Sequence, residues 1–137
     1  MSSSERTVAL IVAAGSGSRV GGDLPKQFRL VRGQPMLRHS YAALASHETI
    51  SDIYVAIGEG QDDFALESLS GLLPPHLVLG GATRRESVLD GLKQIAHDGG
   101  AARVLIHDAA RPFLPHEVIS SLIAVLDFAP GAVPALA

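Results

Sequence analysis

A short apolar run over residues 8–12 stops at a loop of small residues over 13–18, and few folds accommodate such a junction. An apolar run of this length predicts a buried strand, which we expect to cover 7–14. A loop of small residues directly after a strand presents main-chain N–H groups at the edge of a sheet, and such groups suit an anion. Arg19 and Lys26 follow and add two positive charges. The junction therefore predicts a phosphate-binding site at the edge of the sheet.

Apolar runs and helical patterns alternate along the rest of the chain. Further strands are expected at residues 53–57, 76–79, 103–106 and 132–133. Helices are expected from Pro35, over 62–69, after Thr83 and from Pro115. Strands that alternate with helices at this spacing predict an open, mainly parallel α/β sheet with right-handed crossovers and helices on both faces.

The predicted helices carry apolar stripes at helical spacing, which mark the faces that pack on the sheet. In chain order the stripes are Leu37, Tyr41, Leu44 and Ala45, then Val88, Leu92 and Ile95, then Val118, Leu122 and Val125. Thr83 and Glu86 have the spacing of a capping box, in which each side chain bonds the main chain of the other residue. The pair therefore predicts where one helix begins.

Three loops with unusual chemistry follow predicted strands: residues 15–26, 80–87 and 107–111. Ligands of open α/β sheets bind beyond the carboxyl ends of the strands. Because these loops leave different strands of one parallel sheet, we expect them to converge on one crevice.

The composition narrows the class of protein. The chain has 137 residues, enough for one modest domain with a core, and its net charge of -3 argues against a protein built to coat nucleic acid. The absence of cysteine excludes disulfides and thiolate metal sites. Residues 1–6 are polar, unlike a signal peptide, and no apolar run approaches the roughly 20 residues of a membrane span. We therefore expect a cytoplasmic protein with neither a membrane nor a nucleic-acid partner.

The first loop matches no common nucleotide motif completely. Gly15 and Gly17 could open a dinucleotide-binding fingerprint, but Val20 occupies the third glycine position. The Gly-Lys-Ser or Gly-Lys-Thr of a Walker A motif is absent. Two glycines also suffice for a plain turn, although a plain turn has no need of Arg19 and Lys26. Lys26 is either a solvated loop lysine or a point charge on a phosphate, and we favour the phosphate.

The other two loops carry side chains suited to a nucleotide. Gly81 allows a flat base to lie close to the main chain, and Ser87 can direct its hydroxyl at a base edge; a capped helix alone also explains these residues, and the two interpretations are compatible. Asp108 suits Mg²⁺, which prefers one or two carboxylates with phosphate oxygens, although one carboxylate does not make a whole site. His107 is interpreted as structural, and the other histidines show no metal-ligand spacing.

At these loops the chain resembles the 2-C-methyl-D-erythritol 4-phosphate cytidylyltransferase family of the non-mevalonate isoprenoid pathway. The matching segments are 13–19, 25–28, Arg84 with Ser87 and Val88, and 107–112, in the family's order across nearly the whole chain. The resemblance implies a Rossmann-like fold of the nucleotide-diphospho-sugar transferase type. It also implies transfer of CMP from CTP to 2-C-methyl-D-erythritol 4-phosphate, with release of pyrophosphate and with Mg²⁺ or another divalent cation as cofactor.

The resemblance implies roles for the matching positions of the first loop. CTP would be wrapped by the residues that follow the first strand: Ala13, Ala14, Gly15, Ser16, Gly17 and Ser18. Arg19 and Lys26 would be catalytic and would act on the triphosphate and the transition state.

The later loops would complete the CTP site. Gly81 and Ser87 would contact cytosine, and Asp108 would serve the ribose and Mg²⁺. Arg84 and Ala109 belong to the same implied site. Ala82 departs from the family, in which an aspartate often contacts the base.

The family's domain is longer than this chain. Its second half carries the methylerythritol phosphate contacts, another catalytic lysine and a dimer arm, whereas this chain stops within an apolar run at 134–137. We therefore expect residues 1–137 to be the CTP-binding part of one cytidylyltransferase domain, inactive alone and a homodimer at full length. In some bacteria the domain is fused to the cyclodiphosphate synthase of the pathway, and the sequence leaves both arrangements open.

Two other functions compete with this interpretation. Another nucleotidyltransferase, such as a sugar-phosphate or molybdopterin enzyme, would place its lysine differently from Lys26. A non-catalytic nucleotide-binding module would bind CTP without needing Lys26 and Asp108 together. Measured pyrophosphate release from CTP distinguishes the module from the enzymes.

Overall fold

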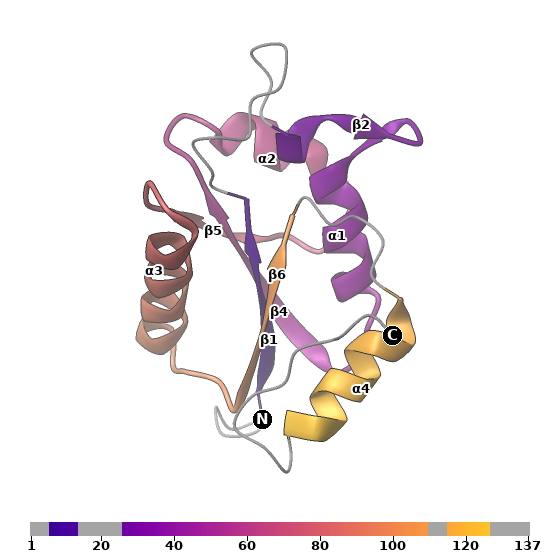
Figure 1. Cartoon of the computed structure of the whole chain (residues 1–137), viewed down its shortest axis with the longest axis vertical. Coiled ribbons are helices and arrows are strands. Elements are labelled where there is room, and N and C mark those ends of the chain that lie inside the picture. The colour runs from indigo at the N-terminus through magenta and orange to yellow at the C-terminus, as the bar shows by residue number, and fades with distance from the viewer. Residues whose placement is uncertain (1–5, 14–25, 110–114, 127–137) are drawn as a thin grey trace.

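A computed structural model describes residues 6–13, 26–109 and 115–126, and at Lys26 it describes the main chain only (Figure 1). In this part of the chain four parallel strands form a sheet in the order β5-β4-β1-β6. The strands are β1 (Thr7–Val12), β4 (Ile50–Ile57), β5 (His76–Leu79) and β6 (Arg103–Asp108). The predicted open α/β sheet is confirmed. Its predicted fifth strand, 132–133, lies outside the described residues.

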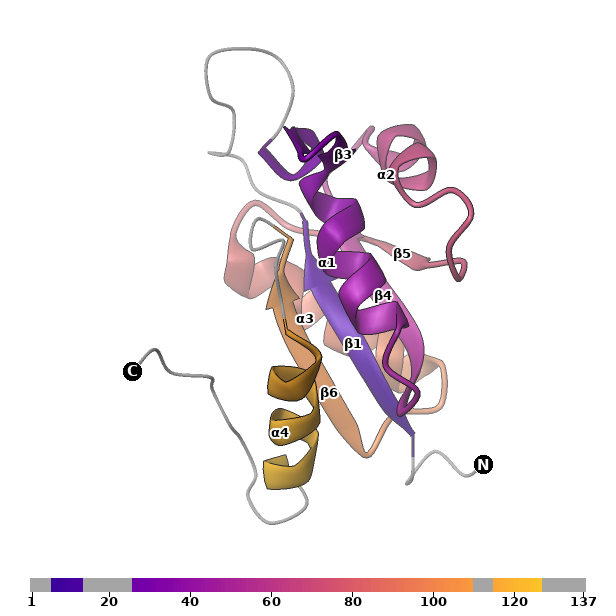
Figure 2. The ribbon, with the colours of Figure 1, turned by 90° about the vertical axis from the view of Figure 1, so that its right-hand side faces the viewer.

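Helices cover both faces of this sheet, as predicted. In Figure 1, α3 (Arg84–His97) lies on one side of the strands, and α1 (Met36–Ala45) and α4 (His116–Leu126) lie on the other. The short helix α2 (Asp62–Ser68) packs near the first turns of α1 (Figure 2). None of the helices in the described part of the chain has the length and apolarity needed to cross a membrane.

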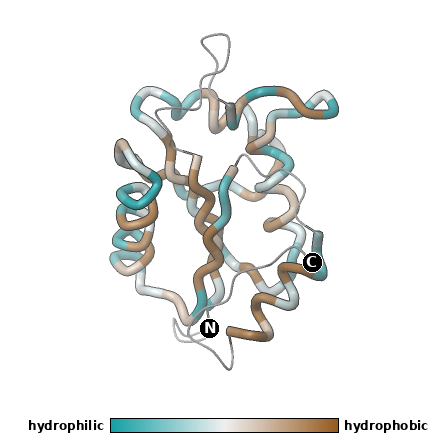
Figure 3. Tube along the Cα trace, in the orientation of Figure 1, coloured by the Kyte–Doolittle hydropathy of each residue, from teal (hydrophilic) through white to brown (hydrophobic). Residues whose placement is uncertain are grey.

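β1 is the most enclosed of the four strands, and all its residues are buried. Its trace is mostly hydrophobic in Figure 3. Its successive side chains point to opposite faces of the sheet because strand side chains alternate. Leu10 belongs to the core beside α3, with Ile95, whereas Ile11 belongs to the core beside α1 and α4, with Leu37 and Ile119. The strand therefore joins two apolar cores, one on each face.

α3 approaches β1 closely at Gly91. A Cβ atom at this position would lie 2.5 Å from a methyl carbon of Leu10, which is fully buried. The buried residues of α3 are Ser87, Gly91 and Ile95. The predicted stripe is therefore wrong at Leu92, which is 36% exposed, because the small residues of the helix face the sheet.

On the other face of the sheet, the sequence predicted the buried residues of α1 better than those of α4. α1 buries Leu37, Tyr41 and Leu44 of its predicted stripe, and Ala45 is half-buried. In α4 the buried residues are Ile119 and Ile123, while Val125 of the predicted stripe is 45% exposed. Two adjacent rows of apolar residues run along α4 at helical spacing. The sequence periodicity therefore did not show which of the two rows is buried.

A two-residue turn at Arg32 and Gly33 joins β2 (Leu30–Val31) to β3 (Gln34–Pro35) as an antiparallel pair. Both turn residues have positive φ, 51° and 79°, as a type I′ hairpin turn requires. Pro35 has ψ of 144° and pairs with Leu30, so it precedes α1 as its N-cap. The expectation that Pro35 is the first helical residue is wrong by one residue.

A polar network closes the amino end of the sheet. Arg6 donates from Nη2 to Asp52 Oδ2 at 2.9 Å and from Nη1 to Gly100 O at 2.9 Å. His76 Nε2 lies 3.1 Å from Asp52 Oδ1. Burial alone raises the pKa of the Asp52 carboxyl, but the hydrogen bonds and charges of His76 and Arg6 outweigh it and hold that pKa below its ordinary value.

Candidate functional site

The strand order reverses at β1. The chain passes from β1 to β4 and β5 on one side and then returns to β6 on the other side of β1. The crevice beyond the carboxyl ends of the strands at such a reversal is the usual ligand site of an open α/β sheet. In Figure 1, β1 and β6 run side by side and end near the same edge. We place the candidate site at this carboxyl edge.

Ala13 and Ala109 extend β1 and β6 by one residue each at this edge. The N–H of Ala13 donates to Ala56 O at 2.8 Å, and the N–H of Ala109 donates to Val12 O at 3.0 Å. Both alanines are buried, and the buried hydroxyl of Ser40 on α1 donates to Ala109 O at 3.1 Å. The two strand ends from which the predicted CTP loops leave are therefore held in place by hydrogen bonds.

The main chain of Lys26 lies in one turn of 3-10 helix, η2 (Lys26–Phe28). Gln27 is 4% exposed and donates its side-chain amide to Ala13 O. Phe28 is buried, and its ring stacks on that of Phe64 in α2 with ring centroids 5.5 Å apart. The turn is thus attached to the end of β1 on one side and to α2 on the other.

The loop after β5 leads directly into α3. The N–H of Gly81 donates to Ser87 Oγ at 3.1 Å, and Ser87 is fully buried. A Cβ atom on Gly81 would overlap the side chain of Glu86, so the position has no room for one. Glu86 N–H donates to Thr83 Oγ1 at 3.1 Å, and Glu86 Oε2 accepts the N–H of Ala82 at 2.8 Å. The predicted capping box is confirmed.

Asp108 and Arg84 lie towards opposite ends of the carboxyl edge of the described sheet. Asp108 is the half-buried last residue of β6, and Arg84 is the exposed first residue of α3, which follows β5. β4 and β1 separate β5 from β6, which corresponds to three inter-strand spacings, or about 14 Å. An extended ligand is needed to reach from one side to the other.

The structure brings part of the predicted site to one edge of the sheet. The described members at that edge are Ala13, Gly81, Arg84, Ser87, Asp108 and Ala109. Other predicted members lie outside the described residues: Ala14, Gly15, Ser16, Gly17, Ser18, Arg19 and the side chain of Lys26. Half-buried His107 pairs with Ile11 within the sheet, as a structural residue would.

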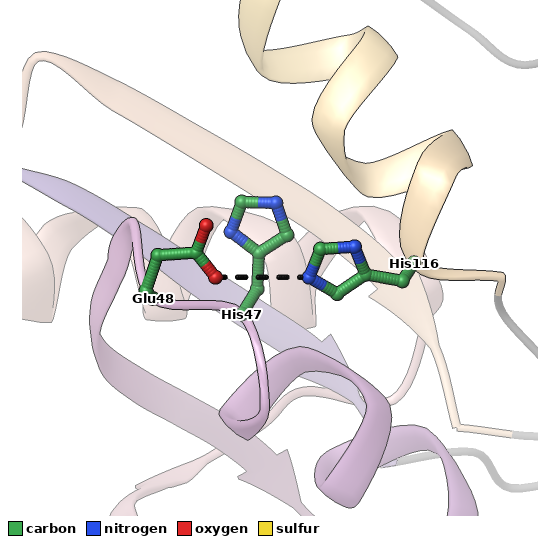
Figure 4. Close-up of side chains that lie close together, drawn as sticks. All are labelled: His47, Glu48 and His116. Atoms are coloured by element: carbon green, nitrogen blue, oxygen red, sulfur yellow. Dashed lines mark ion pairs between the residues drawn. The ribbon is translucent and has the colours of Figure 1, made fainter.

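A separate group of titratable side chains joins the end of α1 to the start of α4 (Figure 4). His47, Glu48 and His116 each have a metal-ligand atom within 4.8 Å of the others, a proximity that their sequence spacing did not predict. His47 Nδ1 accepts the N–H of Thr49 at 3.2 Å, so its proton is on Nε2, which donates to Ser120 Oγ at 2.9 Å. Because both nitrogens of the buried His47 ring are engaged, we interpret the group as a contact between helices.

Sequence reasoning assigned no role to Gln27 or Ser40, the two side chains that bond the ends of β1 and β6. Ser40 lies between Leu37 and Leu44 on the buried face of α1. A polar residue within an apolar stripe is a usable signal, because a buried polar group needs a hydrogen-bond partner. Gln27 lies within the matching segment 25–28, but nothing in that segment indicated its contact with Ala13.

Comparisons with known proteins agree on one family. Residues 7–137 match the family model described as 2-C-methyl-D-erythritol 4-phosphate cytidylyltransferase. The chain is 54% identical over 129 residues to a protein of Rhizorhabdus wittichii named bifunctional enzyme IspD/IspF, covering 94% of this chain and 33% of that protein. It is 44% identical over 132 residues to the 2-C-methyl-D-erythritol 4-phosphate cytidylyltransferase of Cereibacter sphaeroides, covering 95% of this chain and 58% of that protein.

A solved structure with the same fold is the 4-diphosphocytidyl-2C-methyl-D-erythritol synthase of Anaerococcus prevotii. The TM-score is 0.73 at 30% sequence identity, and the match covers 91% of this chain and 52% of that chain. The chain therefore spans between 33% and 58% of the length of these three proteins.

Proposed function

Because the chain belongs to the 2-C-methyl-D-erythritol 4-phosphate cytidylyltransferase family, we propose that residues 1–137 form the CTP-binding part of such an enzyme. The full-length protein transfers CMP from CTP to 2-C-methyl-D-erythritol 4-phosphate and releases pyrophosphate. Residues beyond this chain hold most of the acceptor.

The observation that carries this proposal is the arrangement of strand ends along the carboxyl edge of the sheet. Asp108 ends β6 beside the end of β1, where Ala13 begins the first loop. The unit formed by Gly81 and Ser87 lies at the end of β5, about 14 Å from β6 by ordinary sheet spacing. This distance supports a bound CTP that places its cytosine at the end of β5 and its phosphates near the ends of β1 and β6.

The chemistry requires positioning and charge stabilisation rather than a covalent enzyme intermediate. A phosphate oxygen of the acceptor attacks the α-phosphorus of CTP in line and forms a new P–O bond. The bond from the α-phosphorus to the bridging oxygen breaks, and its electrons leave with pyrophosphate. Arg19 and Lys26 stabilise the negative charge that grows on the α-phosphate and the leaving group. Main-chain N–H groups of residues 14–18 hold the phosphates.

Asp108 fits the requirements of a Mg²⁺ ligand. Its carboxylate is a hard oxygen donor at a half-buried strand end, and Mg²⁺ is commonly held by one or two carboxylates together with substrate phosphates. We propose that Asp108 and the phosphate oxygens of CTP hold the ion, whose charge offsets that of the phosphates.

The remaining features of the proposal concern the full-length protein. It is a cytoplasmic homodimer without a nucleic-acid partner, and the net charge of -3 of this chain supports the last point. The Rhizorhabdus relative is named as bifunctional and the Cereibacter relative is not, so both arrangements occur among the relatives.

Pyrophosphate release by the full-length protein, with CTP and 2-C-methyl-D-erythritol 4-phosphate, tests the function. Lys26→Ala is expected to lower kcat by on the order of 10²-fold or more, the scale of losing one transition-state donor. Lys93→Ala, at an exposed position of α3, is the matched control and is expected to leave kcat unchanged. Near wild-type turnover by Lys26→Ala would contradict the assignment. Transfer by the isolated 137-residue chain would contradict the proposed division of the site.

A further inference from the structure

We infer that Gln27 is a positioning residue that holds the Lys26-bearing turn against the end of β1 and so places the Lys26 ammonium at the phosphates. The inference rests on the proposed function for the role of Lys26. The contacts of Gln27 are independent of that function.

The side-chain amide nitrogen of Gln27 uses both of its hydrogens. It donates to Ala13 O, and also to Gln61 Oε1 at 3.4 Å. Gln61 Oε1 accepts the N–H of Gly58 at 3.1 Å as well. The Gln27 amide thus links the first residue after β1 to the loop after β4. Because Gln27 is 4% exposed, an amide turned away from these acceptors would leave buried polar groups without partners.

No flexible segment separates this anchor from Lys26. Lys26 and Gln27 are consecutive residues of η2, and Phe28 is buried against Phe64 on the other side. Directly after the turn, Arg29 O accepts the N–H of Met36 at 2.9 Å. The contacts of the residues that follow Lys26 therefore fix its main chain. The position of its ammonium group then depends only on the side-chain torsions.

The Gln27–Ala13 contact joins the two parts of the proposed phosphate site. Ala13 directly precedes the segment whose main-chain N–H groups would hold the phosphates, and Lys26 supplies the cation. A misplacement of about 1 Å between such groups can lower a rate by about 10²-fold. A residue that only stabilised the fold would have no reason to act through Lys26, and this difference can be measured.

The first experiment compares Gln27→Met with the wild type in the full-length protein. Methionine keeps the approximate length and volume of glutamine but donates no hydrogen bond. We expect kcat for CMP transfer to fall about 10- to 100-fold, with the KM for CTP raised by no more than about 10-fold, because Lys26 contacts the phosphates in the ground state and more strongly in the transition state. Gln34→Met, the same substitution at an exposed position of β3, is expected to leave both constants unchanged.

A double-mutant cycle with Lys26→Ala separates positioning from a general structural role. If Gln27 acts through Lys26, adding Gln27→Met to Lys26→Ala lowers kcat by no more than about twofold further. Equal effects of Gln27→Met in both backgrounds would overturn the inference, and so would a folded Gln27→Met protein with wild-type kcat. If Gln27→Met does not fold, Gln61→Met enters the same cycle, because it removes the acceptor of the second amide hydrogen.

Binding of inorganic pyrophosphate, measured by calorimetry on the same four proteins, gives a readout that needs no turnover. We expect Gln27→Met to weaken binding about 5- to 10-fold when Lys26 is present and by no more than about twofold when it is absent. Equal weakening in both backgrounds, or none in either, would overturn the inference. A wild-type protein that binds pyrophosphate but transfers no CMP would contradict the proposed function alone.

Discussion

Asp108 lies opposite Val12 in the parallel pairing of β6 with β1. Because Val12 is the last residue of β1, this register places the carboxylate where the glycine-rich loop leaves the sheet. The N–H of Ala109 then donates to Val12 O at 3.0 Å and continues the pairing by one residue. Two segments far apart in the sequence are thus brought together at the carboxyl edge by ordinary strand pairing.

Asp108→Asn tests the proposed metal role of this carboxylate. The amide keeps the size of the side chain but loses its charge, so the Mg²⁺ concentration for half-maximal CMP transfer is expected to rise at least about 10-fold. The measurement is a Mg²⁺ titration of the rate in the full-length protein. Asp90→Asn, a half-buried aspartate within α3, is the control and should not move the titration. An unchanged Mg²⁺ requirement in Asp108→Asn would count against the role.

Thr83→Ala tests the start of α3. Thr83 Oγ1 accepts the N–H of Glu86 at 3.1 Å, and the substitution leaves that donor without its partner. Loss of such a cap typically lowers the free energy of unfolding by about 1 kcal/mol. Denaturant unfolding measures the change, with Thr49→Ala at an exposed position as the matched control, expected to change it by less than about 0.5 kcal/mol. Equal effects of the two substitutions would show that the cap contributes little.

The sequence predicted those parts of the fold that depend on short-range patterns. The capping box of Thr83 and Glu86 lies within four residues, and the strand at 76–79 has the predicted bounds. The meeting of the strand ends at one edge was predictable as well, because the strands were expected to be parallel.

Predictions were wrong where partners are distant in the sequence. β4 begins at Ile50 rather than at 53, although its second and third residues are polar. Ser51 donates its hydroxyl to Thr7 O at 3.2 Å, and Asp52 bonds Arg6, so both polar side chains find partners on or next to β1. Those partners were not visible in the local pattern.

The candidate site follows the same rule. Gly81 and Ser87 were expected to act on a base, and the structure adds that they bond one another. The hydrogen bond from Gln27 to Ala13 joins residues 14 positions apart in the sequence, and no local pattern indicates it. The residues proposed to carry the chemistry have local sequence signals, whereas the contact between Gln27 and Ala13 has none.

Gly91→Ala tests the close approach of α3 to β1. Alanine favours the helix by about 1 kcal/mol, but its Cβ atom would lie 2.5 Å from a methyl carbon of the fully buried Leu10. Overpacking of this kind typically costs about 1 to 3 kcal/mol. We expect a net loss of up to about 2 kcal/mol in the free energy of unfolding. A double-mutant cycle with Leu10→Ala tests this explanation. The double mutant should lose less free energy of unfolding than the two single mutants lose in total, because the smaller residue at position 10 makes room for the new methyl group. Full additivity would contradict the steric explanation.

Asp52→Asn tests the polar network at the amino end of the sheet through its pH dependence. The pKa of Asp52 is lowered in the folded protein, so between the folded and unfolded pKa values the unfolded chain binds more protons, and stability rises with pH. The carboxylate therefore makes its full contribution to the free energy of unfolding above its ordinary pKa near 4. This contribution is lost as the pH falls through the lower pKa that Asp52 has in the folded protein.

At pH 7 the Asp52→Asn protein should be less stable than the wild type by about 1 kcal/mol or less, because the ion pair with Arg6 is partly exposed to solvent. Denaturant unfolding at a series of pH values should show this difference shrinking below about pH 4 and vanishing once Asp52 is protonated in the folded state. Glu59→Gln, at an exposed position after β4, controls for the loss of one negative charge. A stability difference that stays constant from pH 7 down to the acid limit would mean that the interaction with Arg6 and His76 does not depend on the charge of Asp52.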